Sequence, residues 1–107
     1  KLRPSYYRGA SAIIILFDKG DRSSFEAVSD WFDEIKQYLR HVIPTALVGI
    51  KSGVDTISTE EGERVAQELG FHYFESLPNS KIRVFRIFKF LVRKIIEKKN
   101  RSISLFS

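Results

Sequence analysis

The feature that most constrains the fold is an unbroken apolar run from Ala12 to Phe17, which is followed by the mostly polar residues 18–21. The run is far too short to span a membrane. A short, continuously apolar segment bounded by turn residues is typical of a strand buried on both faces of a parallel sheet. Because parallel strands are joined by crossovers that usually contain a helix, we expect helices and strands to alternate along the rest of the chain.

The residues after this run follow that pattern. We expect Ser23 or Ser24 to cap a helix, whose apolar side chains recur at intervals of three and four positions. These side chains are Phe25, Val28, Phe32, Ile35 and Leu39. A second apolar segment, Thr45 to Ile50, predicts the next strand.

The second half of the sequence continues the alternation and marks its helix ends more clearly. Ser58 and Glu61 form a capping box at a helix start, and Gly70 suits the left-handed position that ends the helix. A short strand is predicted from Phe71 to Glu75, and a long amphipathic helix follows it. The predicted apolar face of this helix consists of Val84, Phe85, Phe88, Leu91, Val92, Ile95 and Ile96.

These elements predict a three-layer α/β fold in which parallel strands, flanked by helices, are joined by right-handed crossovers. Ligands of such sheets bind beyond the carboxyl ends of the strands, which here are residues 18–21, 49–55 and 76–80. A length of 107 residues predicts one domain. We expect the domain to occupy residues 1–99 and residues 100–107 to form a basic, polar and disordered tail.

The net charge of +5 is unevenly distributed. Residues 79–107 carry nine Lys or Arg and one Glu, a net charge of +8, whereas residues 1–78 carry nine Lys or Arg and twelve Asp or Glu, a net charge of −3. This asymmetry indicates either weak contact with an anionic membrane surface or an ordinary solvated helix face. No nucleic acid partner is expected. The absence of cysteine excludes disulfides and thiolate chemistry.

Six segments carry a further pattern. They are Tyr6 to Ala10, Ile14 to Asp18, Asp21 to Phe25, Leu47 to Lys51, Glu60 to Glu63 and Phe90 to Ile95. In this order they resemble the C-terminal portion of the small GTPases of the Ras superfamily, and more specifically of its Rab branch, over residues 1–99. The resemblance implies part of the P-loop NTPase fold, with GTP or GDP and Mg²⁺ as ligands. It also implies protein effectors in membrane traffic and a cytoplasmic location, peripheral at membranes.

The guanine-binding motifs of that family are altered in this chain. The resemblance places Ile50 to Gly53 where the family has Asn-Lys-x-Asp, and only Lys51 matches. Leu77 to Asn79 falls where the family has Ser-Ala-Lys, whose backbone amide contacts guanine, and Pro78 has no N–H to offer. The candidate nucleotide-binding residues are Lys51, Asp55 and Asn79.

The phosphate-binding motifs of the family do not occur in this sequence. It contains neither a G-x-x-x-x-G-K-[ST] loop nor the Asp-x-x-Gly motif with its following glutamine. We therefore expect no catalytic residue, no metal ligand and no GTP hydrolysis. A hydrogen bond to a charged group is worth ~1.5–3 kcal/mol, so the missing aspartate alone predicts a large loss of affinity, and we expect nucleotide binding to be lost. Structural roles are expected for His41, His72, Asp18 and Asp21.

The rival hypothesis is a nucleotide-independent interaction module that uses the basic C-terminal helix or an exposed edge strand. The resemblance places Ala12 to Phe17 in the middle of a sheet, beside a strand that this sequence does not contain. The run should therefore expose an unpaired edge. We expect the chain to self-associate through that edge or to be a piece of a longer protein. For the same reason we expect Phe85, Phe88 and Leu91 to be only partly covered.

Overall fold

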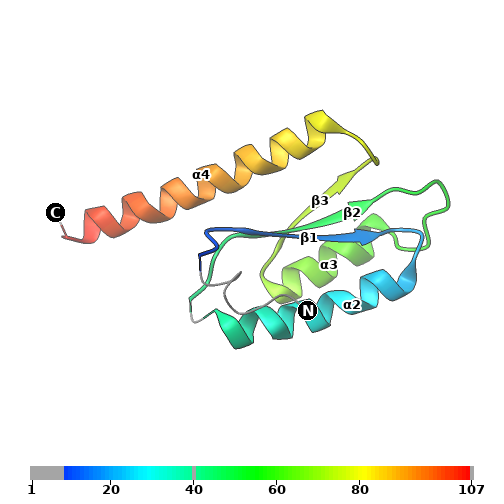
Figure 1. The fold of residues 1–107 in the computed structure, drawn as a ribbon, viewed down its shortest axis with the longest axis horizontal. Helices are drawn as coiled ribbons and strands as arrows, with labels where there is room; N and C mark the ends of the chain where they lie inside the picture. The colour runs from blue at the N-terminus through cyan, green and yellow to red at the C-terminus, as the bar shows by residue number, and fades with distance from the viewer. Residues whose placement is uncertain (1–8, 40, 107) are drawn as a thin grey trace.

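The fold is a parallel sheet between two layers of helix, as the alternation of elements predicts (Figure 1). The computed structural model describes residues 9–39 and 41–106, so Tyr6 to Arg8 in the first of the six segments lie outside the described residues. The strands β1 (Ile13–Asp18), β2 (Thr45–Ile50) and β3 (His72–Ser76) are parallel and lie in the order β1-β2-β3. The predicted fold class is confirmed.

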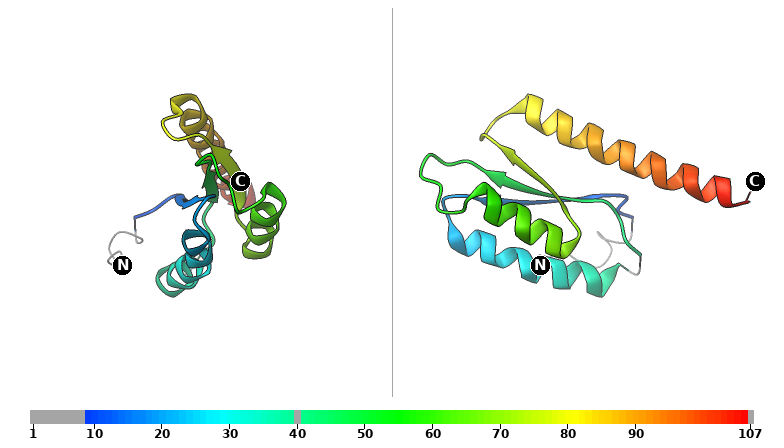
Figure 2. Two further views of the ribbon diagram at one scale, coloured as in Figure 1. Left: turned by 90° about the vertical axis from the view of Figure 1, so that its right-hand side faces the viewer. Right: turned by 180° about the vertical axis from the view of Figure 1, so that it is seen from behind.

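Helices cover both faces of this sheet. The helices α2 (Arg22–Tyr38) and α3 (Thr59–Leu69) lie on one face, and α4 (Lys81–Phe106) crosses the other (Figure 1, Figure 2). The helix α4 packs mainly against β2 and β3. Among the described residues, the face of β1 on that side is therefore largely uncovered.

The strand register brings the carboxyl ends of all the strands to one edge of the sheet. Ile13 pairs with Thr45 at the start of β1, and Asp18 pairs with Ile50 at its end, while Ile50 also pairs with Ser76 of β3. β2 is central and almost entirely buried. β1 has a described neighbour on one side only, so the predicted unpaired edge is present among the described residues.

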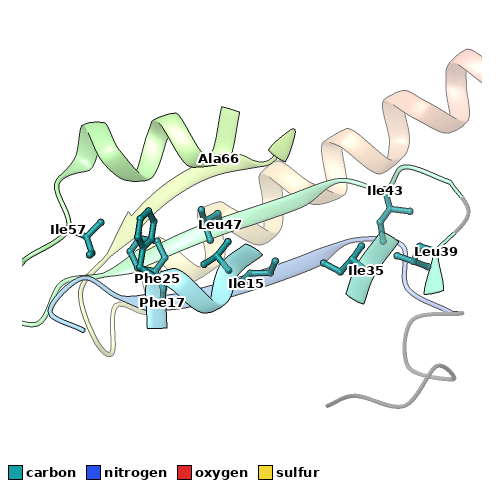
Figure 3. Close-up of a cluster of buried hydrophobic side chains, with 10 residues drawn as sticks. Ile15, Phe17, Phe25, Ile35, Leu39, Ile43, Leu47, Ile57 and Ala66 are labelled. Carbon is teal, nitrogen blue, oxygen red and sulfur yellow. The ribbon is translucent and has the colours of Figure 1, made fainter. Parts of the chain in front are cut away.

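The larger core lies between the sheet and the helices α2 and α3 (Figure 3). Alternate side chains of a strand point to the same face, and Ile15 and Phe17 of β1 therefore enter this core together with Leu47 of β2. The α2 stripe packs on them through Phe25, Val28, Ile35 and Leu39. The helical spacing predicted this stripe, and its residue Phe32 is only partly buried.

The core under α4 is smaller, and of the predicted apolar face of α4 only Leu91 is buried in it. Ile87 and Leu91 are the buried α4 residues of this core, and they pack on Ala46 and Val48 of β2. Most of the predicted face is exposed: Val84, Phe85, Phe88, Val92 and Ile96. Apolar residues cover a wide arc of this helix, and only one border of the arc meets the sheet. Phe85 and Phe88 are thus uncovered as expected, whereas Leu91 is fully buried.

The helix ends follow local hydrogen bonding. Asp21, and not Ser23 or Ser24, is the N-cap of α2, because its carboxylate accepts a hydrogen bond from the Ser23 amide. The Ser58 hydroxyl accepts one from the Glu61 amide and caps α3 as predicted. Gly70 ends α3 in the left-handed conformation with φ of 76°.

The last helix is longer than the sequence pattern predicted. We expected a disordered tail from residue 100, but α4 continues to Phe106. Residues 99–106 contain no glycine or proline that would end a helix. The division of the chain into a domain and a tail stays a prediction.

Candidate functional site

A hollow of about 330 Å³ lies at the carboxyl ends of β1 and β2, where the parallel sheet predicts a ligand site. Its lining residues are Leu16, Phe17, Asp18, Ser24, Ile50, Lys51, Ser52 and Pro78. Two of the altered motif segments therefore meet here, since Ile50 ends β2 and is followed by Lys51 and Ser52, and Pro78 follows β3. Of the three candidate residues, only Lys51 lines this hollow.

Lys51 is held by its backbone and its side chain leans toward β3. Its amide donates a hydrogen bond of 2.9 Å to the Ser76 carbonyl, which extends the β2–β3 pairing by one residue. Its Nζ lies 3.9 Å from Oε1 of Glu75, and the side chain is about half exposed. The charge of Lys51 is therefore partly neutralised by Glu75, with its stem open to the hollow.

Asp55 does not line the hollow. Its Oδ1 accepts a hydrogen bond of 3.1 Å from the Ser52 amide, and its Oδ2 lies 3.8 Å from Nζ of Lys19. The carboxylate thus closes the loop that follows β2 and faces a buried cation. In this arrangement it is a structural group of the loop.

Asn79 lies in the turn between β3 and α4, in the left-handed conformation with φ of 67°. It lines a separate groove beneath α4 and not the hollow that contains Lys51. Pro78 lines both. The structure therefore separates the three candidates, with Lys51 in the hollow, Asp55 behind it and Asn79 in the neighbouring groove.

A buried polar cluster behind the hollow was not found from the sequence. Its centre is Lys19, which is 4% exposed although it directly follows β1. Lys19 Nζ donates to Oε2 of Glu75 at 2.7 Å, and the same oxygen accepts from the hydroxyls of Thr59 at 2.7 Å and Tyr73 at 2.8 Å. A glutamate inside a short strand is the signal that could have indicated this cluster, because a buried charge requires partners.

The surroundings of Glu75 keep it ionised. Burial raises the pKa of its carboxyl, but the hydrogen bonds from Lys19, Thr59 and Tyr73, with the charge of Lys19, outweigh burial and hold the pKa below its ordinary value. Burial and the hydrogen bond to Glu75 raise the pKa of the Tyr73 hydroxyl well above its ordinary value. The cluster is therefore a Lys–Glu ion pair supported by two neutral hydroxyl donors.

The backbone of Lys19 ties the loop after β2 to the end of β1. Its carbonyl accepts hydrogen bonds from the Thr56 amide at 2.8 Å and the Ile57 amide at 3.0 Å, and its own amide donates to Ile50 at 2.9 Å. These bonds hold both ends of the loop of residues 51–57 against the end of β1. The loop shape around Lys51 and Asp55 is thus set by a residue outside the motif.

The acids of the loop after β1 have structural roles, as expected. Asp18 Oδ1 accepts from the Gly20 amide at 2.8 Å, and Asp21 caps α2. Among the described residues, no group of three or more His, Cys, Asp or Glu side chains is placed to hold a metal ion. Within the same residues, none of the helices has the length and apolar character that crossing a bilayer requires.

A family profile and the similar proteins both relate this chain to small GTPases. The profile of the Ras family matches residues 1–97. The GTP-binding protein Rab-3D of Rattus norvegicus is 37% identical over 102 residues, which cover 92% of this chain and 47% of that protein. The Ras-related proteins Rab-3C of Bos taurus and Rab-3A of Homo sapiens are also 37% identical over 102 residues, and the match covers 45% and 46% of them. The chain thus spans about half the length of the curated relatives it matches.

Proposed function

The chain belongs to the Ras family of small GTPases, and from that premise we propose that it is a Rab-like member that works as an interaction module without binding guanine nucleotide. The proposed module keeps the family's sheet and helices and uses their surfaces for protein contacts. Its family role would place it in membrane traffic. The proposed difference from a GTP-driven switch is that its contacts do not depend on nucleotide.

The observation that carries this proposal is the state of the carboxylates around the hollow. Asp55 is occupied by the Ser52 amide and faces Lys19. Asp18, the carboxylate among the lining residues, accepts from the Gly20 amide. Asp55 therefore lies outside the hollow, and Oδ1 of Asp18 is turned back onto its own loop, so neither carboxylate stands where the aspartate of the family's motif would face a guanine base.

The other residues that line the hollow provide few hydrogen-bonding groups for a guanine base. Pro78 has no amide hydrogen, and Ile50 brings an apolar side chain where the family has an amide. Lys51 remains as a stem along which a ring could pack, but its Nζ lies near Glu75. These residues do not fit guanine.

A titration with a fluorescent guanine nucleotide in the presence of Mg²⁺ tests the proposal. We expect no saturable binding tighter than a Kd of about 10 µM, which corresponds to about −7 kcal/mol. The rat Rab-3D protein is a suitable positive control for the assay, because it is named as GTP-binding. Tighter binding by the chain that is competed by unlabelled GDP would contradict the proposal.

A second candidate function is self-association through β1. The amides of Ile13 and Lys19 donate toward the β2 side, to Pro44 and Ile50. Because amides alternate in direction along a strand, those of Ile14 and Leu16 face the open edge. An exposed strand edge is a template for pairing with another chain.

Light scattering across a range of protein concentrations tests this candidate. We expect the mean mass to rise with concentration, and Leu16→Lys to prevent the rise because a charge on an edge strand opposes pairing. Val54→Lys adds the same charge at a side chain that is 79% exposed in the loop after β2 and serves as the control. A constant monomer mass at all concentrations would rule self-association out.

A further inference from the structure

The side chain of Lys19 is a buried cation that connects the end of β1 to the loop after β2. It is 5% exposed, and its Nζ lies 2.7 Å from Oε2 of Glu75 and 3.8 Å from Oδ2 of Asp55. The loop lies at the same end of the sheet as the end of β1 (Figure 1). Because a buried charge requires partners, this one ammonium group attracts both carboxylates.

The contacts around Lys19 form a closed ring of charges and hydrogen bonds. Lys51 Nζ lies 3.9 Å from Oε1 of Glu75, while Oε2 of Glu75 faces Lys19. Lys19 in turn faces Oδ2 of Asp55, and Oδ1 of Asp55 accepts from the amide of Ser52, the residue after Lys51. The loop is thus attached to Glu75 at its start and, through Asp55, to Lys19 near its end.

Two glycines make room for a side chain that holds Glu75 in place. Tyr73 donates to Oε2 of Glu75 at 2.8 Å. A Cβ on Gly62 of α3 would lie 2.5 Å from the Tyr73 hydroxyl oxygen, and a Cβ on Gly49 of β2 would lie 2.8 Å from it. The second Cβ would also lie 3.1 Å from Cγ of Lys19. Glycine is disfavoured inside helices and strands, so its use at both positions indicates that the packing of the cluster determines these two residues.

Lys19 is the cation that faces Asp55. In the part of the chain that the structure describes, no other ion pair involves Asp55. The Asp55 side chain is 31% exposed, so water competes with the Ser52 amide for its oxygens, and a hydrogen bond under such competition is weak by itself. The charge of Lys19 therefore supplies the attraction that fixes the direction of the carboxylate.

We propose that Lys19 is a positioning residue that holds the Asp55 carboxylate behind the strand-end hollow. Asp55 is the only acid in the loop of residues 51–57, and it lies two residues beyond Gly53, which stands where the family has its guanine-binding aspartate. Without Lys19 this carboxylate would be free to turn toward the hollow. The role rests on the proposed function and deepens it, because it names the residue that keeps the loop's carboxylate away from a ligand with N–H donors, such as guanine.

A purely structural role for Lys19 predicts a different behaviour of the loop. If its side chain only stabilised the fold, its loss would loosen the loop as a whole. The amides of Thr56 and Ile57 donate to the backbone carbonyl of Lys19, which any residue at position 19 retains. The Ser52 amide donates to the Asp55 side chain instead. A change at Ser52 alone therefore reports the position of the Asp55 carboxylate.

Hydrogen-exchange protection of these amides, measured by NMR on the whole chain, tests the role of Lys19. Lys19→Met keeps an unbranched side chain and removes the charge. We expect the protection factor of Ser52 to fall at least about threefold, and those of Thr56 and Ile57 to stay within about twofold. Lys51→Met is the matched control, because it removes the half-exposed cation beside the same Glu75, and it should leave Ser52 protected.

Two further variants separate positioning from loss of stability. Glu75→Gln breaks the same buried pair but leaves Asp55 as the charged partner of Lys19, so the protection of Ser52 should be retained although the fold is less stable. The double change Lys19→Met and Glu75→Gln removes both buried charges, which costs less than removing one, and it should lower Ser52 protection as Lys19→Met does. The double variant keeps the test decisive if far-UV circular dichroism shows that Lys19→Met is unfolded.

Three results would overturn the positioning role. They are an equal loss of protection at Ser52, Thr56 and Ile57, a loss at Ser52 of less than about threefold in the folded Lys19 variants, and a loss at Ser52 in Glu75→Gln as large as in Lys19→Met. The exchange measurements need no ligand, whereas the nucleotide titration measures binding directly. Failure of the proposed function and failure of the positioning role therefore give different results.

Discussion

Gly53 occupies the position where the family's guanine-binding aspartate would stand, and its backbone suits glycine. Its φ is 97°, a backbone conformation that residues other than glycine adopt only with strain. The loop is fixed around it by the Asp55 bond to Ser52 and by the hydrogen bonds of Lys19. The shape of the loop therefore favours glycine at position 53, and a glycine there has no carboxylate to offer.

Restoring the carboxylate should not restore guanine binding. We expect Gly53→Asp to lower the free energy of unfolding by roughly 1 kcal/mol and to leave the nucleotide Kd weaker than about 10 µM. Gly53→Ala is the matched control, because it introduces the same backbone strain without a charge, and it should be destabilised to a similar extent. Urea unfolding and the nucleotide titration measure the two effects. Tight nucleotide binding by Gly53→Asp alone would show that the loop is adaptable.

Glu75 is the residue on which the buried polar cluster depends. Glu75→Gln leaves Lys19 buried with only Asp55 at 3.8 Å as a nearby negative charge. We expect the free energy of unfolding to fall by roughly 2–3 kcal/mol, somewhat below the usual cost of breaking a buried pair because the amide still accepts hydrogen bonds. Arg22→Gln, which removes the exposed Arg22–Glu61 pair, should have a much smaller effect. Similar losses in the two variants would show that burial of Lys19 is not the cause.

The same carboxylate predicts how stability depends on pH. The pKa of Glu75 in the folded chain lies below its ordinary value of 4.5. A carboxyl with a lowered pKa contributes stability that is present above its unfolded pKa and is lost as the pH falls through its folded pKa. We expect the free energy of unfolding to fall as the pH is lowered below about 4.5, and to fall less steeply in Glu75→Gln. Hydrogen bonds from Ser23 and Arg22 also lower the pKa values of Asp21 and Glu61, so these carboxyls contribute to the remaining slope in the same direction.

At the scale of elements, the sequence predicted most of the fold because local rules determine it. The apolar segment Thr45 to Ile50 is a buried central strand, and the capping box at Ser58 and the glycine at position 70 mark the ends of α3. The orientation of α4 could not be predicted in this way. Its apolar arc is wider than its contact with the sheet, and only the three-dimensional arrangement selects Ile87 and Leu91 as the buried side chains.

Two substitutions on α4 should therefore have unequal effects on stability. Leu91 is 3% exposed, and we expect Leu91→Ala to cost about 2–4 kcal/mol of unfolding free energy because it leaves a cavity. Phe88→Ala, on the exposed side, should change it by less than about 0.5 kcal/mol. Denaturant unfolding of the two variants measures the difference. An equally large loss for Phe88→Ala would indicate that the groove is already filled in the chain itself.

At the scale of the whole molecule, the site was less predictable than the fold. The motif positions identified Lys51, but they gave no indication that Asp55 would be held by Ser52 or that Asn79 would lie in a different recess. The structural role of Lys19 could not be predicted because it depends on Glu75, which is distant in the sequence and adjacent in space. Contacts between distant segments decide such roles, and a single sequence does not specify them directly.

Protection from hydrogen exchange should follow the position of each strand in the sheet. We expect the amides of Leu47 and Val48, in the central strand, to exchange at rates set by global unfolding. The amides of Ile14 and Leu16 face the open edge and should exchange much faster at low protein concentration. Exchange measured by NMR at two protein concentrations checks this, and protection of Ile14 and Leu16 at the higher one would report pairing of β1. Equal rates for β1 and β2 at low concentration would contradict the described sheet order.

The hollow and the groove share a wall, since Leu16, Ile50 and Pro78 line both. A ligand in one recess that shifts any of these side chains changes the shape of the other recess. Thermodynamic linkage makes such an effect reciprocal, so each ligand alters the affinity of the other by the same factor. A small molecule selected to fill the strand-end hollow would thus act as an allosteric modulator of whatever occupies the face beneath α4.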